Sequence, residues 1–114
     1  MLSMSKRRDP ELLCDITDSI SRIENYIKEI NFENFKRDQK TQDAVIRNLE
    51  IIGEASKIIS NEIKNEMPTI PWKKMAGIRD HLFHNYSGIN LDIVWNVVSK
   101  ELSPIKETIV SSKQ

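Results

Sequence analysis

Apolar side chains recur at intervals of three and four residues along most of the chain, which is the pattern of amphipathic helices. The first such stripe follows Asp9 and Pro10 and extends to about Asn31. An aspartate N-cap followed by proline at the first helical position is typical of a helix start. We therefore predict a disordered tail over residues 1–8 and a first helix from Asp9. Its stripe suits an antiparallel bundle or a dimer seam and consists of Leu12, Leu13, Ile16, Ile20, Ile23, Ile27 and Ile30.

A second helix is predicted over about residues 41–66, after a polar connector at residues 32–40 that can form a short helical turn. Gly53 lies in the middle of this helix, where glycine costs about 1 kcal/mol relative to alanine. We therefore expect another helix to approach closely at Gly53. Two prolines in residues 67–71 then break the pattern and predict a rigid connector.

A third, short helix is expected to open at Pro71-Trp72 and to run to about His84. Residues 86–90 read as a turn, with Asn90 as the N-cap of a fourth helix that carries Pro104. Proline inside a helix removes a hydrogen bond, so the last helix should be kinked or broken at Pro104. These elements predict an all-α, up-and-down bundle of four to five helices.

Composition agrees with a single helical domain over residues 1–114, because the chain contains only 3 Gly, 4 Pro and 6% aromatic residues. Its 17 Lys and Arg balance its 17 Asp and Glu. No global field therefore attracts the protein to nucleic acid, and any such contact must be local.

The cysteine content and the apolar runs bear on the compartment. Cys14 is the single cysteine, as suits a reducing compartment, and no apolar run approaches the roughly 18–20 residues of a membrane span. The basic N-terminal residues are followed by Asp9 and Glu11 instead of the apolar run of a signal peptide. We expect a cytoplasmic protein with no membrane contact.

Both histidines of the chain fall within residues 79–86, together with an arginine, an aspartate and a tyrosine. A purely structural reading, with an Arg-Asp pair and a histidine at a helix end, explains the segment about equally well. A metal site built on His81 and His84 with Asp80 or Glu54 is disfavoured, because zinc sites use three or four ligands at recognisable spacings. We expect no metal and no other cofactor.

The spacing Arg79-x4-His84-x-Tyr86 resembles the RX4HXY signature of the HepT branch of the HEPN superfamily. Three further segments also resemble that family, in the same order along the chain: residues 47–55, 70–79 and 90–95. The resemblance implies a homodimeric HEPN bundle that acts as a metal-independent endoribonuclease toxin on tRNA or mRNA.

In that family the signature arginine and histidine are catalytic, which the resemblance carries over to Arg79 and His84. Attack of an RNA 2′-hydroxyl on the adjacent phosphate, giving a 2′,3′-cyclic phosphate, needs a group that moves protons near neutral pH and a cation that matches phosphate oxygens. Five residues of regular helix turn through about 500°, so these two side chains do not share a face of a regular helix. Either the helix ends between them or a second copy of the motif completes the site. Asp80 and Glu54 are expected to support the pair, Asp80 by orienting the histidine and Glu54 by an ion pair with Arg79.

Tyr86 is the residue onto which, by the resemblance, a minimal nucleotidyltransferase (MNT-type) antitoxin would transfer AMP, adding charge and bulk beside the catalytic pair. The structural alternative is a turn aromatic that packs over the helix end. Lys73, Lys74 and Arg47 are candidate RNA contacts, although the two lysines fit ordinary solvated positions equally well. Trp72 and Trp95, each embedded in an apolar helix pattern, are expected in the core.

Two other functions remain open from the sequence. A non-catalytic HEPN module could bind a nucleotide or a nucleotidyltransferase, with Arg79 as a phosphate clamp and without cleavage. A structural helical adaptor would use the motif only as a helix terminus. Cleavage of RNA by the purified protein separates the ribonuclease from both.

Overall fold

The computed structural model describes residues 2–83 and 88–112, with side chains from residue 8 onward. Apart from one isolated bridge between Phe83 and Ile89, regular structure in these ranges is helical, so the all-α prediction is confirmed. None of the helices there combines the length and the apolar content of a membrane span. The elements are α1 (Leu2–Ile27), α2 (Phe32–Lys36), α3 (Gln39–Ile58), α4 (Asn61–Glu66), α5 (Trp72–Ala76), α6 (Ile78–Leu82), α7 (Leu91–Asn96), the π-helical turn η1 (Val97–Glu101) and α8 (Leu102–Ser112).

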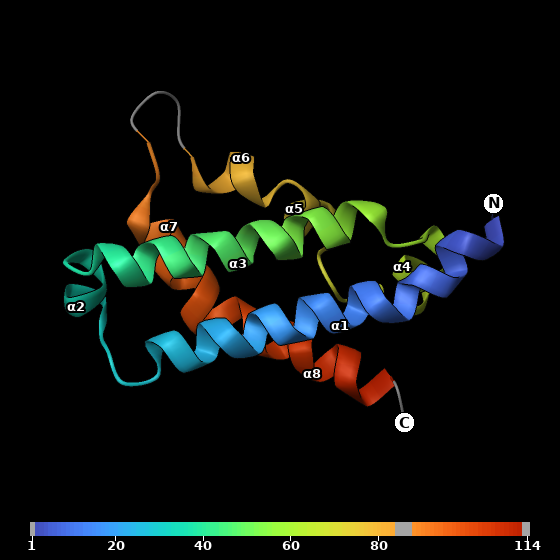
Figure 1. Ribbon diagram of the computed structural model, residues 1–114, viewed down its shortest axis with the longest axis horizontal. Helices are drawn as coiled ribbons and strands as arrows, with labels where there is room; N and C mark the ends of the chain where they lie inside the picture. Colours follow the sequence, from blue (N-terminus) through green and yellow to red (C-terminus); the bar gives the residue numbers. More distant parts are fainter. Residues whose placement is uncertain (1, 84–87, 113–114) are drawn as a thin grey trace.

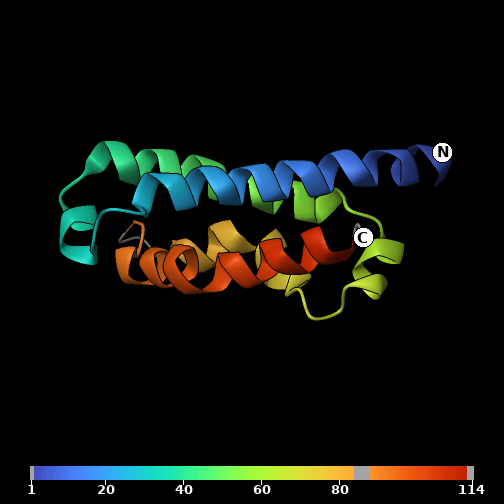
Figure 2. The same ribbon diagram turned by 90° about the horizontal axis from the view of Figure 1, so that it is seen from below.

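The helices form two layers. The successive long segments of the chain run in opposite directions along the long axis. α1 and α3 lie side by side and antiparallel in one layer, while α5 to α8 form the other (Figures 1 and 2). α5 and α6 pack on α3, and α8 packs on α1. The short helices α2 and α4 lie at opposite ends of the molecule (Figure 1). The chain is therefore an up-and-down bundle, as the hydrophobic pattern predicted.

The apolar stripe predicted for the first helix is buried in the core between the two layers. Ile16, Ile20 and Ile23 are completely buried, and Ile27 and Ile30 are partly buried against the same core. The stripe needs no second chain to cover it, so its role is intramolecular packing. Fully buried partners come from the other elements, namely Phe35, Val45, Val94 and Ile109.

The first helix begins earlier than the sequence indicated. α1 starts at Leu2, with Pro10 inside it, so the start predicted at Asp9 was wrong and residues 2–8 of the expected tail are helical. The reason is a distant partner. Asp9 is 3% exposed, and its carboxylate accepts hydrogen bonds from the Ser60 amide at 3.0 Å and the Ser60 hydroxyl at 2.6 Å instead of capping its own helix.

The same contact accompanies a break in the second predicted helix. α3 ends at Ile58, Ile59 and Ser60 are extended, and α4 begins at Asn61, so one helix over residues 41–66 was wrong. Ser60 is the N-cap of α4, and its hydroxyl accepts a hydrogen bond from the Ile63 amide at 3.2 Å. A side chain that caps a new helix and donates to Asp9 stabilises the turn against continued helix.

Gly53 lies where α3 meets α5 and α6, which together form the third leg of the bundle; the sequence indicated such a close approach. A Cβ atom on Gly53 would lie 2.8 Å from Ile78 Cγ2 and 3.2 Å from the Met75 carbonyl oxygen. The third leg itself is split at Gly77 into α5 and α6. It ends at Leu82, so the single helix expected to reach about His84 was wrong.

The last leg of the bundle, from α7 to α8, is irregular just before Pro104. Asn90 caps α7 by accepting a hydrogen bond from the Ile93 amide at 3.1 Å, which confirms its predicted role. The helix then widens into the π turn η1 before it continues as α8 through Pro104. Proline offers no amide hydrogen to the carbonyl of Lys100, and its ring crowds that carbonyl. A widened turn around Lys100 relieves this crowding without breaking the helix.

An ion pair ties α1 to α8 at the edge of the bundle. The carboxylate of Glu24 accepts hydrogen bonds from the Ser103 hydroxyl at 2.5 Å and the Lys106 ammonium at 2.9 Å. Burial raises the pKa of Glu24, but these hydrogen bonds and the charge of Lys106 outweigh it, so the pKa lies below its ordinary value of 4.5.

Gly53→Ala should lower the free energy of unfolding by about 1–3 kcal/mol, because the added methyl meets a backbone carbonyl that cannot turn away. This loss exceeds the gain in helix propensity of about 1 kcal/mol. Gly77→Ala is the matched control, since its Cβ would meet only the Lys73 carbonyl oxygen at an ordinary 3.5 Å. Urea denaturation measures both variants, and equal stability of the two would contradict the close contact.

Glu24→Gln should lower the free energy of unfolding at neutral pH by about 0.5–1 kcal/mol, the range of partly exposed ion pairs. Because the folded-state pKa is depressed, the stabilisation is present above pH 4.5 and is lost as the pH falls through the folded-state value. The difference between variant and wild type should therefore be smaller in acid, below pH 4.5, than at neutral pH. Glu107→Gln, an exposed position on α8, should show no difference at either pH.

Candidate active site

The signature segment is joined at its base by backbone hydrogen bonds. The Asn90 amide donates to the Leu82 carbonyl oxygen at 2.8 Å, and Phe83 pairs with Ile89 in an antiparallel bridge. Gly88 has a φ of 85°, a conformation that side chains rarely adopt. His84 and Tyr86 lie outside the described residues, so their predicted roles stay predictions. The chain on either side of them is held together at the end of α6.

The end of α6 bears on the predicted pair of catalytic residues. α6 stops at Leu82, and its C-cap Phe83 is extended with ψ of 120°. The helix thus ends between Arg79 and His84, which is one of the two conditions under which these side chains could act together. The end of the helix also removes the helical spacing by which Asp80 was expected to face His84. Asp80 is exposed on α6, and its orienting role remains a prediction.

Arg79 projects from α6 toward α3. Its side chain is 74% exposed, and its Nη1 atom lies 3.4 Å from Oε2 of Glu50. The guanidinium also lies 5.7 Å from the centroid of the Phe83 ring. Glu50 was not among the residues singled out from the sequence, although it belongs to the family-like segment at residues 47–55. Its position one helical turn before Glu54 was the signal that could have identified it.

Glu54 takes a different partner from the one expected. Its carboxylate pairs with Lys57 at 3.1 Å, so the predicted ion pair with Arg79 was wrong and Glu50 takes that place. Both glutamates nevertheless line the same surface groove as Arg79. Glu54 therefore remains a candidate member of the site.

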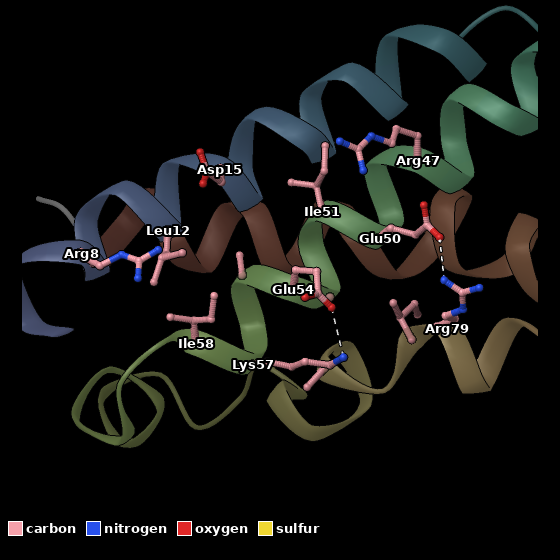
Figure 3. A pocket seen from close by; sticks show the side chains of 14 residues that line it. Arg8, Leu12, Asp15, Arg47, Glu50, Ile51, Glu54, Lys57, Ile58 and Arg79 are labelled. Carbon is pink, nitrogen blue, oxygen red and sulfur yellow. Dashed lines mark hydrogen bonds and ion pairs between the residues drawn. The ribbon is translucent and has the colours of Figure 1, made fainter.

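This groove, which we call the α3 groove, lies between α1, α3 and the short helices α5 and α6, and has a volume of about 570 Å³ (Figure 3). Cationic, acidic and apolar side chains all line this groove. Arg47 lines the groove, and its side chain makes no ion pair or hydrogen bond with another described residue. The charged lining residues are Arg8, Asp15, Arg47, Glu50, Glu54, Lys57 and Arg79.

The predicted RNA-binding residues divide into two groups. Arg47 shares the α3 groove with Arg79, whereas Lys73 and Lys74 do not line it. Lys74 instead pairs with Glu101 at 2.9 Å on another face of α5. The geometry therefore gathers only Arg47 with Arg79, and an RNA contact by the two lysines stays a prediction.

The two tryptophans that were predicted for the core are buried or partly buried. Trp72 is buried and its indole nitrogen donates to the Met67 carbonyl oxygen at 3.0 Å, which confirms its core position. Trp95 is partly buried and packs on Phe32 and Phe35, with ring centroids 5.9 and 5.2 Å away. Over residues 2–83 and 88–112, no group of three or more His, Cys, Asp or Glu side chains is arranged to hold a metal ion.

Comparison with known proteins gives a consistent family. The family model described as "Ribonuclease HepT-like" matches residues 16–111. The chain is 48% identical over 101 residues to "Probable ribonuclease HepT" of Thermococcus cleftensis, covering 89% of this chain and 92% of that protein. It is 32% identical over 123 aligned positions to "mRNA nuclease HepT" of Shewanella oneidensis, covering 82% and 92%. No solved structure matches the chain. The match over most of its length, together with the intact Arg79-x4-His84-x-Tyr86 signature, places this chain in the HepT-like ribonuclease family of the HEPN superfamily.

Proposed function

We propose that this protein is a metal-independent endoribonuclease toxin that cuts RNA by attack of a 2′-hydroxyl on the neighbouring phosphate. The observation that carries the proposal is the placement of Arg79, an exposed cation at the rim of the α3 groove on the helix that leads directly into the rest of the signature. Family membership supplies the second support. The chemistry needs only side chains of the signature.

In the proposed reaction, the 2′-oxygen loses its proton and forms a bond to phosphorus, while the bond from phosphorus to the 5′-oxygen breaks and that oxygen gains a proton. The products are a 2′,3′-cyclic phosphate and a 5′-hydroxyl. His84 exchanges protons at near-neutral pH and serves as general acid or base. Arg79 stabilises the negative charge of the crowded phosphorane through its planar fork of N–H donors.

A homodimer completes the proposed site. One chain carries one signature, and the reaction removes a proton from one oxygen and adds a proton to another. Two signatures that face each other across a shared cleft supply two histidines for these transfers. The high exposure of Arg79 and the open α3 groove leave room for such an arrangement.

For the substrate and the partner, we propose mRNA cleavage in the cytoplasm, with tRNA as the second candidate substrate, and control by an MNT-type nucleotidyltransferase antitoxin. The name of the Shewanella oneidensis relative supports mRNA. In the proposed control step, the Tyr86 hydroxyl attacks the α-phosphorus of ATP, which forms a phosphodiester to AMP and releases pyrophosphate. The added negative charge beside Arg79 and His84 repels RNA phosphate.

The cleavage proposal predicts that wild type cuts synthetic mRNA or total tRNA in EDTA and leaves cyclic-phosphate ends. Arg79→Ala and His84→Ala should each lower the rate by at least about 100-fold, the size of one lost general acid–base or charge-stabilising group. Gel analysis with end-group mapping measures this. Absence of cleavage by folded wild type would favour the non-catalytic module that binds nucleotide or nucleotidyltransferase.

The control proposal predicts that incubation with an MNT-type nucleotidyltransferase and ATP adds AMP to wild type and suppresses its cleavage of RNA. Tyr86→Phe keeps the aromatic ring but lacks the acceptor oxygen, so its activity should be the same with and without this treatment. Intact-mass spectrometry and the ratio of treated to untreated rates measure the effect. Loss of activity in treated Tyr86→Phe would place the modified residue elsewhere.

A further inference from the structure

Arg79 is poorly fixed by its own helix. α6 has only five residues, and the Arg79 side chain is 74% exposed. An arginine side chain with this much freedom loses rotamer entropy when it is ordered. Charge stabilisation in catalysis depends on a donor that is already in place, within about 0.5 Å of its working position. Another group must therefore restrict the guanidinium before RNA arrives.

Glu50 is placed to do this from a rigid element. It lies on α3, the 20-residue helix whose Leu49 and Ile52 are each 1% exposed in the core. Its side chain is 35% exposed, and its carboxylate lies 3.4 Å from the Arg79 guanidinium, which also lies 5.7 Å from the centroid of the Phe83 ring. Figure 3 shows Glu50 reaching across the α3 groove to Arg79, whereas Glu54, one turn further along, reaches Lys57.

We propose that Glu50 is a positioning residue for RNA cleavage, which holds one edge of the Arg79 guanidinium and leaves the rest of its fork for the scissile phosphate. This inference rests on the proposed ribonuclease function. A guanidinium has five N–H donors, and the contact to Glu50 uses one nitrogen at a long distance. An exposed ion pair of this kind is weak, so Glu50 orients Arg79 without competing strongly against a phosphate.

The charge of Glu50 has a second effect that makes the proposal testable. A carboxylate beside Arg79 weakens the attraction of the groove for RNA phosphates, because the negative carboxylate and the negative phosphate repel each other at short range. Glu50→Gln removes that repulsion and also weakens the hold on Arg79. Binding of RNA should improve while the chemical step slows. Glu50→Asp keeps the charge but is one methylene shorter, so it should lose only the hold on Arg79.

The experiment measures kcat and KM for a synthetic mRNA in EDTA with full-length wild type and three variants. For Glu50→Gln we expect kcat to fall roughly tenfold and KM to fall about threefold. For Glu50→Asp we expect a similar fall in kcat with KM within about twofold of wild type. Glu33→Gln is the matched control, because Glu33 pairs with Lys36 at 3.0 Å on α2, outside the α3 groove, and should change neither constant.

The outcomes separate this inference from the proposed function. Failure of wild type to cleave RNA would refute the ribonuclease and the role of Glu50 together. Cleavage by wild type with unchanged kcat in Glu50→Gln and Glu50→Asp would refute the positioning role alone. A fall in kcat with unchanged KM in Glu50→Gln, accompanied by a lower melting temperature, would assign Glu50 to fold stability. Opposite changes in binding and turnover in Glu50→Gln support the proposal.

Discussion

The close approach of α3 and the third leg at Gly53 determines where the candidate site lies. Ile78 packs directly over Gly53, and the next residue along α6 is Arg79. α3 supplies Glu50 one turn before that contact. A larger residue at position 53 would push α6 away and would move Arg79 relative to Glu50. The polar geometry of the α3 groove thus depends on an apolar contact inside the bundle, which is the stronger of the two.

The other end of the signature depends on Asn90. Its side chain caps α7, and its backbone amide donates to the carbonyl oxygen of Leu82, which is the last residue of α6. One residue therefore starts the last leg of the bundle and joins it to the end of the third. The chain that carries His84 and Tyr86 is held at both ends by helices whose inner faces are buried. A short segment anchored in this way can hold reactive side chains at the surface while the core supplies its stability.

The sequence predicted the features that depend on local pattern, and it missed those that depend on distant partners. The stripe of α1, the close contact at Gly53 and the Asn90 cap follow from periodicity and from residue type. The start of α1 was wrong because the partner of Asp9 is Ser60, which lies 51 positions away. Spacing along α3 could not tell whether Glu50 or Glu54 faces Arg79. That choice is made by the rotation of α3 against α6, a property of packing that no single helix encodes.

The balance of charge explains why such local contacts matter for the proposed function. A chain with 17 basic and 17 acidic residues attracts RNA weakly from a distance. Within the α3 groove, the carboxylates of Asp15, Glu50 and Glu54 nearly offset the cations, so the groove also lacks a strong general attraction for phosphate. The cations are Arg8, Arg47, Lys57 and Arg79. Binding that relies on few phosphate contacts depends weakly on salt and releases RNA readily. In the proposed site, the carboxylates that limit the affinity for RNA also orient the cations. RNA then binds less tightly, but Arg79 is better placed for the reaction.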